Sequence, residues 1–328
     1  MKEIEPISLD GVKSYPLSER KSLVNSESFA LPFKKGGALS VWLERLPRIL
    51  AAKDFMEVSD LIAQAACERK TVILAMGAHP IKVGLSPIII DLMGKGIISA
   101  LAMNGAGIIH DSEVAMVGRT SEDVADGLGC GSFGMAEETG RILNQAITRG
   151  AEKGWGLGKS VGAALIEGAF PFNRLSILAS AFEMKIPVTV HVAIGTDIIH
   201  VHPTADGAAT GKASHTDFRI FARMISTLNK GVFVNLGSAV VLPEVFLKAL
   251  TLVRNLGYEV DDFTTVNMDF IRQYRPMTNV VSRPTRKGGR GFNLTGHHEL
   301  MFPLLAAAVM ERLGPDYFEK KELQNAHI

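Results

Sequence analysis

Cysteine is scarce in this chain, and long apolar runs are missing. The two cysteines, Cys67 and Cys130, lie far apart and form no CxxC pair, which excludes a disulfide scaffold and indicates a reduced compartment. No stretch approaches the roughly 20 uninterrupted apolar residues of a membrane-spanning helix. Residues 1–6 also lack the basic start and apolar core of a signal peptide. We therefore expect a cytoplasmic protein with no membrane partner.

A surplus of charge of one sign is missing as well. The sequence has 35 lysines and arginines against 34 aspartates and glutamates, for a formal net charge of +1. Proteins that bind nucleic acid usually need a basic surplus to neutralise phosphates, so nucleic acid is not expected as a partner. A nearly neutral surface gives little repulsion between copies, which favours a homo-oligomer.

The first 38 residues differ in pattern from the rest of the chain. Residues 1–38 are polar, with three prolines and a Gly36–Gly37 break, and we expect an extended N-terminal arm that could lie across a neighbour in an oligomer. From Leu39 onward apolar residues recur at helical spacing. The sequence has no internal repeat, so residues 39–328 are interpreted as one Rossmann-like domain.

Within that domain, short apolar runs alternate with longer amphipathic stretches. Strands are predicted at 71–76, 97–103, 187–192, 231–236 and 262–266, and helices at 86–93, from 112, and at 215–229, 243–256 and 298–312. The strands are continuously apolar, as expected when helices cover both faces of a sheet. Connections of this length between parallel strands are right-handed. The predicted fold class is therefore α/β, a Rossmann-like parallel sheet with helices on both faces.

Ligands in such sheets bind outside the carboxyl ends of the strands. The segments that follow the predicted strands are Gly77-Ala78-His79-Pro80, Asn104-Gly105-Ala106-Gly107, 193–197, Gly237-Ser238-Ala239 and 267–269. Glycine lets the backbone approach a ligand closely, and helix N-termini favour phosphate. These segments are candidate contacts for a small-molecule ligand, although turns between strands and helices often contain Gly and Asn for conformational reasons alone.

The histidines suggest a different chemistry. His200 and His202 would share one face of an extended segment. Together with Asp197, His298 and Glu299 they could supply the imidazole and carboxylate ligands of a zinc site. A metal-dependent hydrolase that uses His200, His202 and His298 is therefore an alternative function, and local hydrogen bonding or helix capping is the simpler explanation.

A basic segment lies between the last predicted strand and the last helix. Four cations fall between Arg283 and Arg290, and they could clamp a phosphate or a carboxylate or form a solvated loop. Flanking arginines would also lower the pKa of Lys287 and raise its nucleophilic fraction.

The strand-end segments, taken in order, resemble the deoxyhypusine synthase family and its bacterial relatives between Leu39 and Leu313. The resemblance rests on 104–111, on 186–188 leading to 195–199, on 235–241 and on 301–306. It implies a Rossmann-like NAD-binding domain that assembles as a homotetramer. In that family a hydride passes from spermidine to NAD, and the aminobutyl group moves as an imine onto an enzyme lysine.

The resemblance also assigns roles to residues. It implies dinucleotide contacts at Ala78, His79, Asn104, Gly105, Ala106 and Gly237, to which the neighbouring Gly77, Gly107, Ser238 and Ala239 are added. It implies that Asp197 holds the substrate and that Lys287 is the nearest counterpart of the imine-forming lysine. His110 or His298 could then transfer protons.

The family's Trp-Gly-Lys motif has no counterpart, because the only tryptophans are Trp42 and Trp155. We therefore predict an NAD-dependent transferase of the deoxyhypusine synthase-like type that acts on an amine or related small molecule, rather than authentic deoxyhypusine synthase. A non-catalytic nucleotide-binding protein remains a further alternative.

Overall fold

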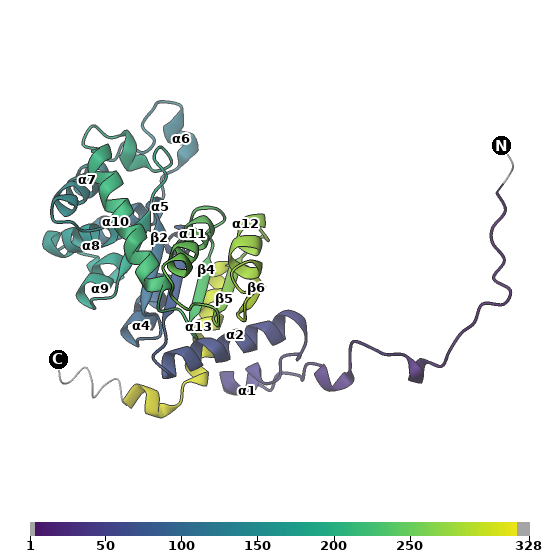
Figure 1. Ribbon diagram of the computed structural model, residues 1–328. Helices are drawn as coiled ribbons and strands as arrows, with labels where there is room; N and C mark the ends of the chain where they lie inside the picture. The colour runs from purple at the N-terminus through teal and green to yellow at the C-terminus, as the bar shows by residue number, and fades with distance from the viewer. Residues whose placement is uncertain (1–3, 320–328) are drawn as a thin grey trace.

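The computed structural model describes residues 4–319. Its centre is a six-stranded sheet in which every strand is parallel to its neighbours (Figure 1). The strands are β1 (Val72–Met76), β2 (Ala100–Asn104), β3 (Val188–His191), β4 (Val232–Leu236), β5 (Thr264–Asp269) and β6 (Arg290–Thr295). Their order is β3-β2-β1-β4-β5-β6. The predicted α/β class with a parallel sheet is confirmed.

Helices cover both faces of this sheet. One face packs against α10 (Gly207–Ile225), α11 (Val241–Asn255) and η5 (Met277–Ser282). The other packs against α2 (Leu50–Cys67), α4 (Ser86–Gly94), α5 (Gly105–Val117), α8 (Leu157–Gly168), α9 (Ile177–Glu183) and α13 (His298–Arg312), while α7 (Glu137–Glu152) packs against α8 and α10. The shorter elements are α1 (Leu39–Leu43), α3 (His79–Lys82), α6 (Val124–Leu128), α12 (Tyr274–Pro276), η1 (Leu17–Glu19), η2 (Ser26–Ser28), η3 (Asn173–Leu175) and η4 (Ile198–Val201).

Burial on both faces explains the continuous apolar strands. All five residues of β1 and of β4 are buried. On the α10/α11 face, four phenylalanines form a contiguous aromatic layer, in which the rings of Phe233 and Phe246 stack at 3.9 Å. Burying an aromatic side chain of this kind stabilises the fold by about 1.5–3 kcal/mol, so this layer holds α11 firmly against the strands that lead to the site.

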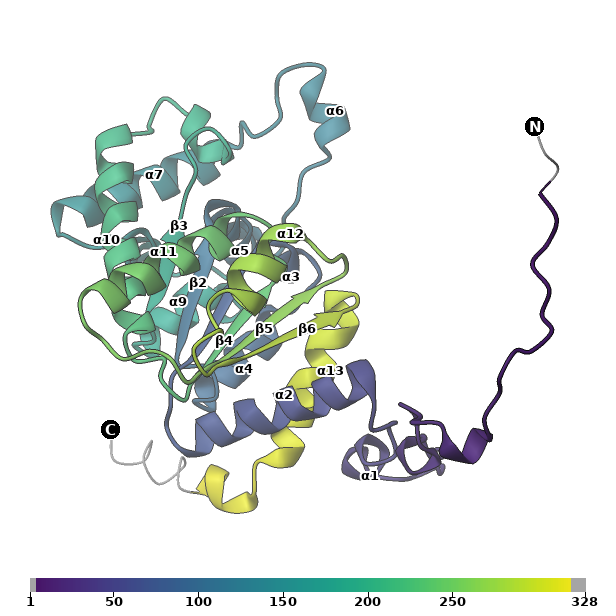
Figure 2. The ribbon, with the colours of Figure 1, turned by 45° about the vertical axis from the view of Figure 1, so that its right-hand side comes forward.

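Two segments project from the body of the molecule. Residues 4–38 run away from it (Figure 1), with exposed apolar side chains such as Ile4 and Leu23. The segment that carries α6 also extends outward, between α5 and α7 (Figure 2). No helix within residues 4–319 has the length and apolar character needed to cross a membrane.

Three expectations about the elements need correction. The basic segment from Arg283 to Arg290, for which a solvated loop was one interpretation, ends in the first residue of the edge strand β6. Residues 267–269 were expected to follow a strand, but they belong to β5. The segment Asn104–Gly107 is no loop either, because α5 begins at Gly105, directly after β2. A glycine-rich, cationic strand gives little apolar signal at an edge, and glycine usually signals a turn.

Candidate functional site

The chain reverses its direction of travel across the sheet between β1 and β4, which lie side by side. In doubly wound sheets this switch point opens the crevice in which ligands bind. The turns after the two strands pack closely: a Cβ on Gly77 would lie 2.6 Å from the Gly237 carbonyl oxygen. Gly237 also has a φ of +67°, which favours glycine. The two predicted glycine segments therefore meet at the switch point.

His298, the first residue of α13, lies over this turn. Its side chain is 1% exposed, and a Cβ on Gly237 would lie 2.6 Å from His298 Cε1. The Nε2 atom is 3.8 Å from Asp269 Oδ1, and neither ring nitrogen has a hydrogen-bond partner among the described residues. Burial lowers the pKa of His298, while the nearby Asp269 carboxylate partly opposes that shift. The result is a mostly neutral imidazole that can gain or lose a proton at the carboxyl edge.

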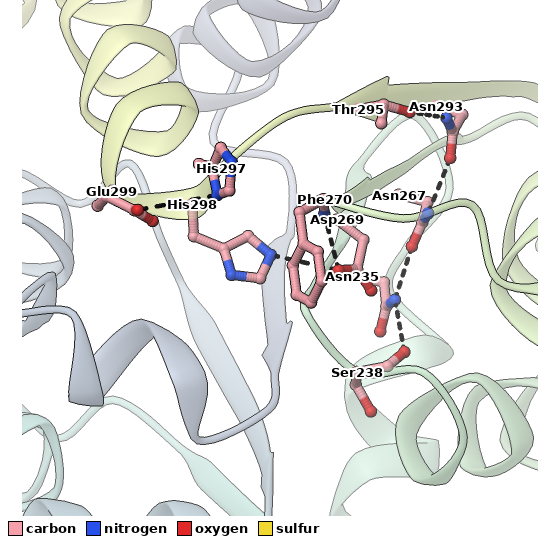
Figure 3. A network of polar contacts seen from close by, with 10 residues as sticks. All are labelled: Asn235, Ser238, Asn267, Asp269, Phe270, Asn293, Thr295, His297, His298 and Glu299. Atoms are coloured by element: carbon pink, nitrogen blue, oxygen red, sulfur yellow. Dashed lines mark hydrogen bonds and ion pairs between the residues drawn. The ribbon is translucent and has the colours of Figure 1, made fainter.

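Aromatic and imidazole rings surround His298. The ring of His79, at the start of α3, lies 5.4 Å from it at a steep angle. The ring of Phe270, directly after β5, lies 6.1 Å away and is itself stacked on His297 (Figure 3). Phe270 remains 48% exposed. It therefore offers an aromatic face to a planar ring at the mouth of the site.

A row of asparagines lies behind these groups. Asn235, Asn267 and Asn293 occupy paired positions on β4, β5 and β6, and their side-chain amides join through two hydrogen bonds of 2.8 Å (Figure 3). Asn235 Nδ2 also donates to the carbonyl oxygen of Ser238. Asparagine is unfavourable in buried strands, so this ladder indicates a requirement other than packing. It fixes the Ser238 backbone beside the switch point.

The N-terminus of α5 forms the second part of the site. The Asn104 side chain accepts a hydrogen bond from the Gly107 amide, as an N-cap does. Asp197, which follows β3, packs against Gly105 so closely that a Cβ there would collide with its carboxylate. Asp197 is 7% exposed, and its Oδ2 has no hydrogen-bond partner among the described residues. Burial raises the pKa of this carboxyl, although His200 partly opposes the shift.

His110 lies farther along α5 in a hydrogen-bonded chain of its own. Thr120 Oγ1 donates to Glu113 Oε2 at 2.5 Å and lies 2.7 Å from His110 Nδ1. Because this hydroxyl already donates to the carboxylate, it accepts from Nδ1–H. That tautomer leaves His110 Nε2 as the free acceptor. Burial lowers the pKa of His110; the nearby Glu113 carboxylate partly opposes this shift, and Lys82 of α3 adds to it.

The histidine cluster of the metal-dependent hydrolase does not form. His202 Nε2 lies 2.8 Å from the Gly134 carbonyl oxygen and its ring packs against Gly140 of α7, whereas His298 lies over Gly237. Within residues 4–319 no three histidine, cysteine, aspartate or glutamate side chains are grouped so that they could hold a metal ion. Alternation in sequence could not show this, because η4 turns the segment from His200 to His202 away from an extended conformation.

Lys287 is not brought to the site. It lies in the turn before β6, whose first residue, Arg290, pairs with Thr264 at the start of β5. The amino ends of parallel strands share one edge, and a strand of six residues spans about 20 Å. Lys287 is therefore at the opposite edge of the sheet from His298. Arg290 of the same basic segment forms an ion pair with Glu57 at 2.6 Å, which favours the structural interpretation over an anion clamp.

A large hollow opens at this amino edge, with a volume of about 1220 Å³. Its walls include Cys67, Lys70, Lys185 and Tyr317. None of its lining side chains is a buried polar group without a partner. Parallel α/β sheets bind ligands at the carboxyl edge, so we place the functional site there rather than in this hollow.

The sequence interpretation included Asp269 in a candidate segment without giving it a role, and it missed Phe270 and the asparagine ladder as parts of the site. A signal for the ladder was present: each of three consecutive strands carries an asparagine among apolar residues. Buried polar groups are nearly always paired, so asparagines on neighbouring strands should find one another. Only the register of β4, β5 and β6 shows that they do, and the sequence did not reveal β6 at all.

Three solved structures share this fold at low sequence identity. A candidate deoxyhypusine synthase from Entamoeba histolytica is 12% identical, with a TM-score of 0.53 over 86% of this chain and 96% of its own. A conserved candidate LOR/SDH protein from Methanococcus maripaludis S2 is 15% identical, with a TM-score of 0.51 over 80% of this chain and 70% of its own. Unliganded AgrE is 13% identical, with a TM-score of 0.50 over 81% of this chain and 34% of its own.

The chain thus spans about a third of the length of AgrE. No family model matches the sequence, and no curated protein matches it. The likeness to the three solved structures establishes a common fold.

Proposed function

We propose that this chain is a deoxyhypusine synthase-like, NAD-dependent enzyme whose site lies at the carboxyl edge of the sheet. The observation that carries the proposal is His298, a buried imidazole beside the glycine turn of the switch point, whose two nitrogens have no hydrogen-bond partner within residues 4–319. The shared fold with the candidate deoxyhypusine synthase, along nearly its whole length, supports the same interpretation.

The residues present fit a nicotinamide dinucleotide in two respects. The turn at Gly237 carries no side chain and has a positive φ, so a ligand can approach its backbone closely, and the neutral His298 imidazole adds one donor and one acceptor at the same place. Phe270 offers an exposed aromatic face for a ring. We propose that these residues, with Ala78 and His79 on the facing turn, hold the cofactor. When bound, NAD would supply a hydride acceptor.

The chain's own groups would bind the substrate and move its protons. We propose that Asp197 and Asp269 attract a cationic amine, since both carboxylates lie at the carboxyl edge and an amine donates well to a carboxylate. His298, held beside Asp269, would accept a proton from the amine nitrogen. His110, with Nε2 as a free acceptor, is a second candidate for proton transfer.

A transferase of this type needs an acceptor for the group that leaves the amine. We do not assign that role to Lys287, because it lies at the opposite edge of the sheet. Transfer to an external amine is therefore the form of the reaction that we propose. A homo-oligomer is part of the proposal, because apolar residues of the 4–38 segment are exposed in the single chain. Light scattering of the purified protein would measure its oligomeric state.

Isothermal titration with NAD and NADP tests the cofactor site. We expect saturable binding of one dinucleotide, and a loss of at least about tenfold in affinity on His298→Gln, which corresponds to about 1.4 kcal/mol. His215→Gln is the matched control, because His215 is exposed on α10. An unchanged unfolding temperature would show that His298→Gln still folds. If NAD and NADP both fail to bind, the chain is not a dinucleotide-dependent enzyme.

If NAD binds but no amine is oxidised, the non-catalytic nucleotide-binding alternative is favoured. A screen of diamines, polyamines and basic amino acids for NADH absorbance at saturating NAD would separate these two outcomes. Release of NADH with any of them would support the enzyme.

A further inference from the structure

Two independent observations meet at the start of α5. The helix has 13 residues, so its first-turn amides and its dipole form an anion-binding end. Of those amides, Gly107 is already taken by the Asn104 side chain. The carboxylate of Asp197 lies against Gly105. Asp197 is more than nine-tenths buried, and its Oδ2 atom has no hydrogen-bond partner among the described residues.

We propose that the start of α5 is a binding site for the phosphate of the ligand and that Asp197 is its removable plug. In the conformation described here the carboxylate occupies the place of the phosphate, and a phosphate-bearing ligand displaces it. The inference rests on the proposed function for the identity of that ligand, a dinucleotide. The chemical class of the ligand, a phosphate ester or anhydride, is inferred from the start of α5 independently of the proposed function.

Asp197 is poorly stabilised where it lies. A carboxylate that belonged permanently at a helix N-terminus would accept hydrogen bonds from the first-turn amides, as Asp206 does from Ala208 and Ala209 at the start of α10. Asp197 makes no such bond to α5, and burial raises the pKa of its carboxyl. The field of the helix end, together with His200 and Thr196, offsets only part of the loss of hydration. A phosphate carries more acceptor oxygens and would satisfy the same amides better.

The turn that leads to Asp197 is exposed. Residues 193–196 are exposed, with Ile194 69% exposed, and Gly195 has a φ of +92°. A hydrogen bond of 3.2 Å from the Gly195 amide to His200 Nδ1 closes the turn. Two residues on, Ile199 is fully buried in the core, and the His200 amide donates to the Asp197 carbonyl, so displacement moves the exposed turn and the Asp197 side chain while the backbone after it stays in place.

Gly105 is part of the same device. Any side chain at this position would collide with the Asp197 carboxylate, so glycine is needed for the plug to seat. A glycine at the first position of a helix is not otherwise required, since its φ is not positive. The pairing of a bare helix start with an acidic plug predicts an order of binding: the phosphate enters first, and the released Asp197 then meets a cationic substrate.

Calorimetric titration of the whole chain with NAD and with inorganic pyrophosphate, separately, tests the plug. Asp197→Asn keeps the size of the side chain and removes its charge. We expect both probes to bind this variant about tenfold more tightly than wild type, as expected from removing a like charge at a helix end. Asp262→Asn is the matched control, because Asp262 is exposed at the amino edge of the sheet. Unfolding temperatures would verify that both variants fold.

The outcomes separate the plug from the proposed function. Tighter pyrophosphate binding by Asp197→Asn, without NAD binding by any variant, supports the plug and rejects the dinucleotide. If wild type binds NAD, and Asp197→Asn binds both NAD and pyrophosphate no more tightly than wild type does, the plug is overturned and the cofactor site remains. If neither probe binds either protein, both proposals fail.

Discussion

The asparagine ladder across β4, β5 and β6 allows the contribution of buried polar groups to the stability of the fold to be predicted. Replacing Asn267 with Val removes the middle of the ladder and both of its 2.8 Å hydrogen bonds. Asn235 Nδ2 keeps its bond to the Ser238 carbonyl, but Asn293 Oδ1 is left without its donor. Asn235 is fully buried, so water cannot easily satisfy its second amide N–H, whereas Asn293 is partly exposed and can be hydrated.

The expected magnitude follows from opposing terms. Leaving buried polar groups unpaired costs about 1–3 kcal/mol each, and the new valine returns about 1–2 kcal/mol by its burial. We therefore expect Asn267→Val to lower the free energy of unfolding by about 1–3 kcal/mol. Urea unfolding followed by circular dichroism measures this, with the slope compared to wild type to confirm that the folded state remains compact.

The triple variant Asn235→Val, Asn267→Val, Asn293→Val sharpens the test. When every partner is apolar, no ladder amide is stranded, and such replacements can be nearly neutral. We expect the triple variant to be more stable than Asn267→Val alone, yet to bind NAD more weakly because Ser238 has lost its anchor. A triple variant whose destabilisation equals the sum of the three single ones would refute this reasoning. A single variant within 0.5 kcal/mol of wild type would also refute it, because substitutions away from special features fall in about that range.

Two further predictions concern residues away from the cofactor. Lys287→Ala should leave NAD binding unchanged in calorimetry, because Lys287 lies at the amino edge of the sheet; a loss would mean that this segment reaches the site. Asp217 accepts hydrogen bonds from the Gly158 and Val190 amides, and burial raises its pKa from 3.8 to about 7. At pH values between 3.8 and about 7, Asp217 is protonated in the folded chain and ionised in the unfolded chain. The free energy of unfolding should therefore fall by roughly 4 kcal/mol as pH rises from about 4 to 7. Asp217→Asn should flatten that dependence in urea titrations at pH 5 and pH 7.5, and an unaltered slope would contradict the assignment.

The central strands could be predicted from the sequence because burial on both faces leaves an unmistakable apolar run. The observed β1 and β4 lie within one residue of the predicted limits. The sheet's far edge could not be predicted in the same way. β6 begins with Arg290 and Gly291, both exposed, and its pairing with β5 depends on backbone hydrogen bonds that leave no periodic pattern in the side chains.

The site was predicted unevenly for a similar reason. Glycine and asparagine after a strand mark a place on the carboxyl edge, so the sequence could place Gly77, Asn104 and Gly237 at that edge, where the structure has them. Whether side chains from different segments meet depends on the three-dimensional path of the chain. Sequence alone therefore grouped His202 with His298, which the structure separates, and it could not bring Asp269 to His298, which the structure places 3.8 Å apart.

The distribution of unpaired groups decides between a structural and a functional account of the carboxyl edge. Buried polar atoms without partners are rare, and each costs about 1–3 kcal/mol. Among the described acids and histidines, four side chains carry such atoms: Asp197, His200, Asp217 and His298. Three of these four follow β3 or β6 at the carboxyl edge, beside glycines that bare the backbone. Unpartnered side-chain atoms also occur elsewhere among the described residues, for example on Ser112, Asn173 and Thr265, so the carboxyl edge is distinguished by the acids and imidazoles that it collects, which can exchange protons, and not by their number. A ligand with several polar groups would offset the cost of all three at once, and that is the physical basis for expecting one there.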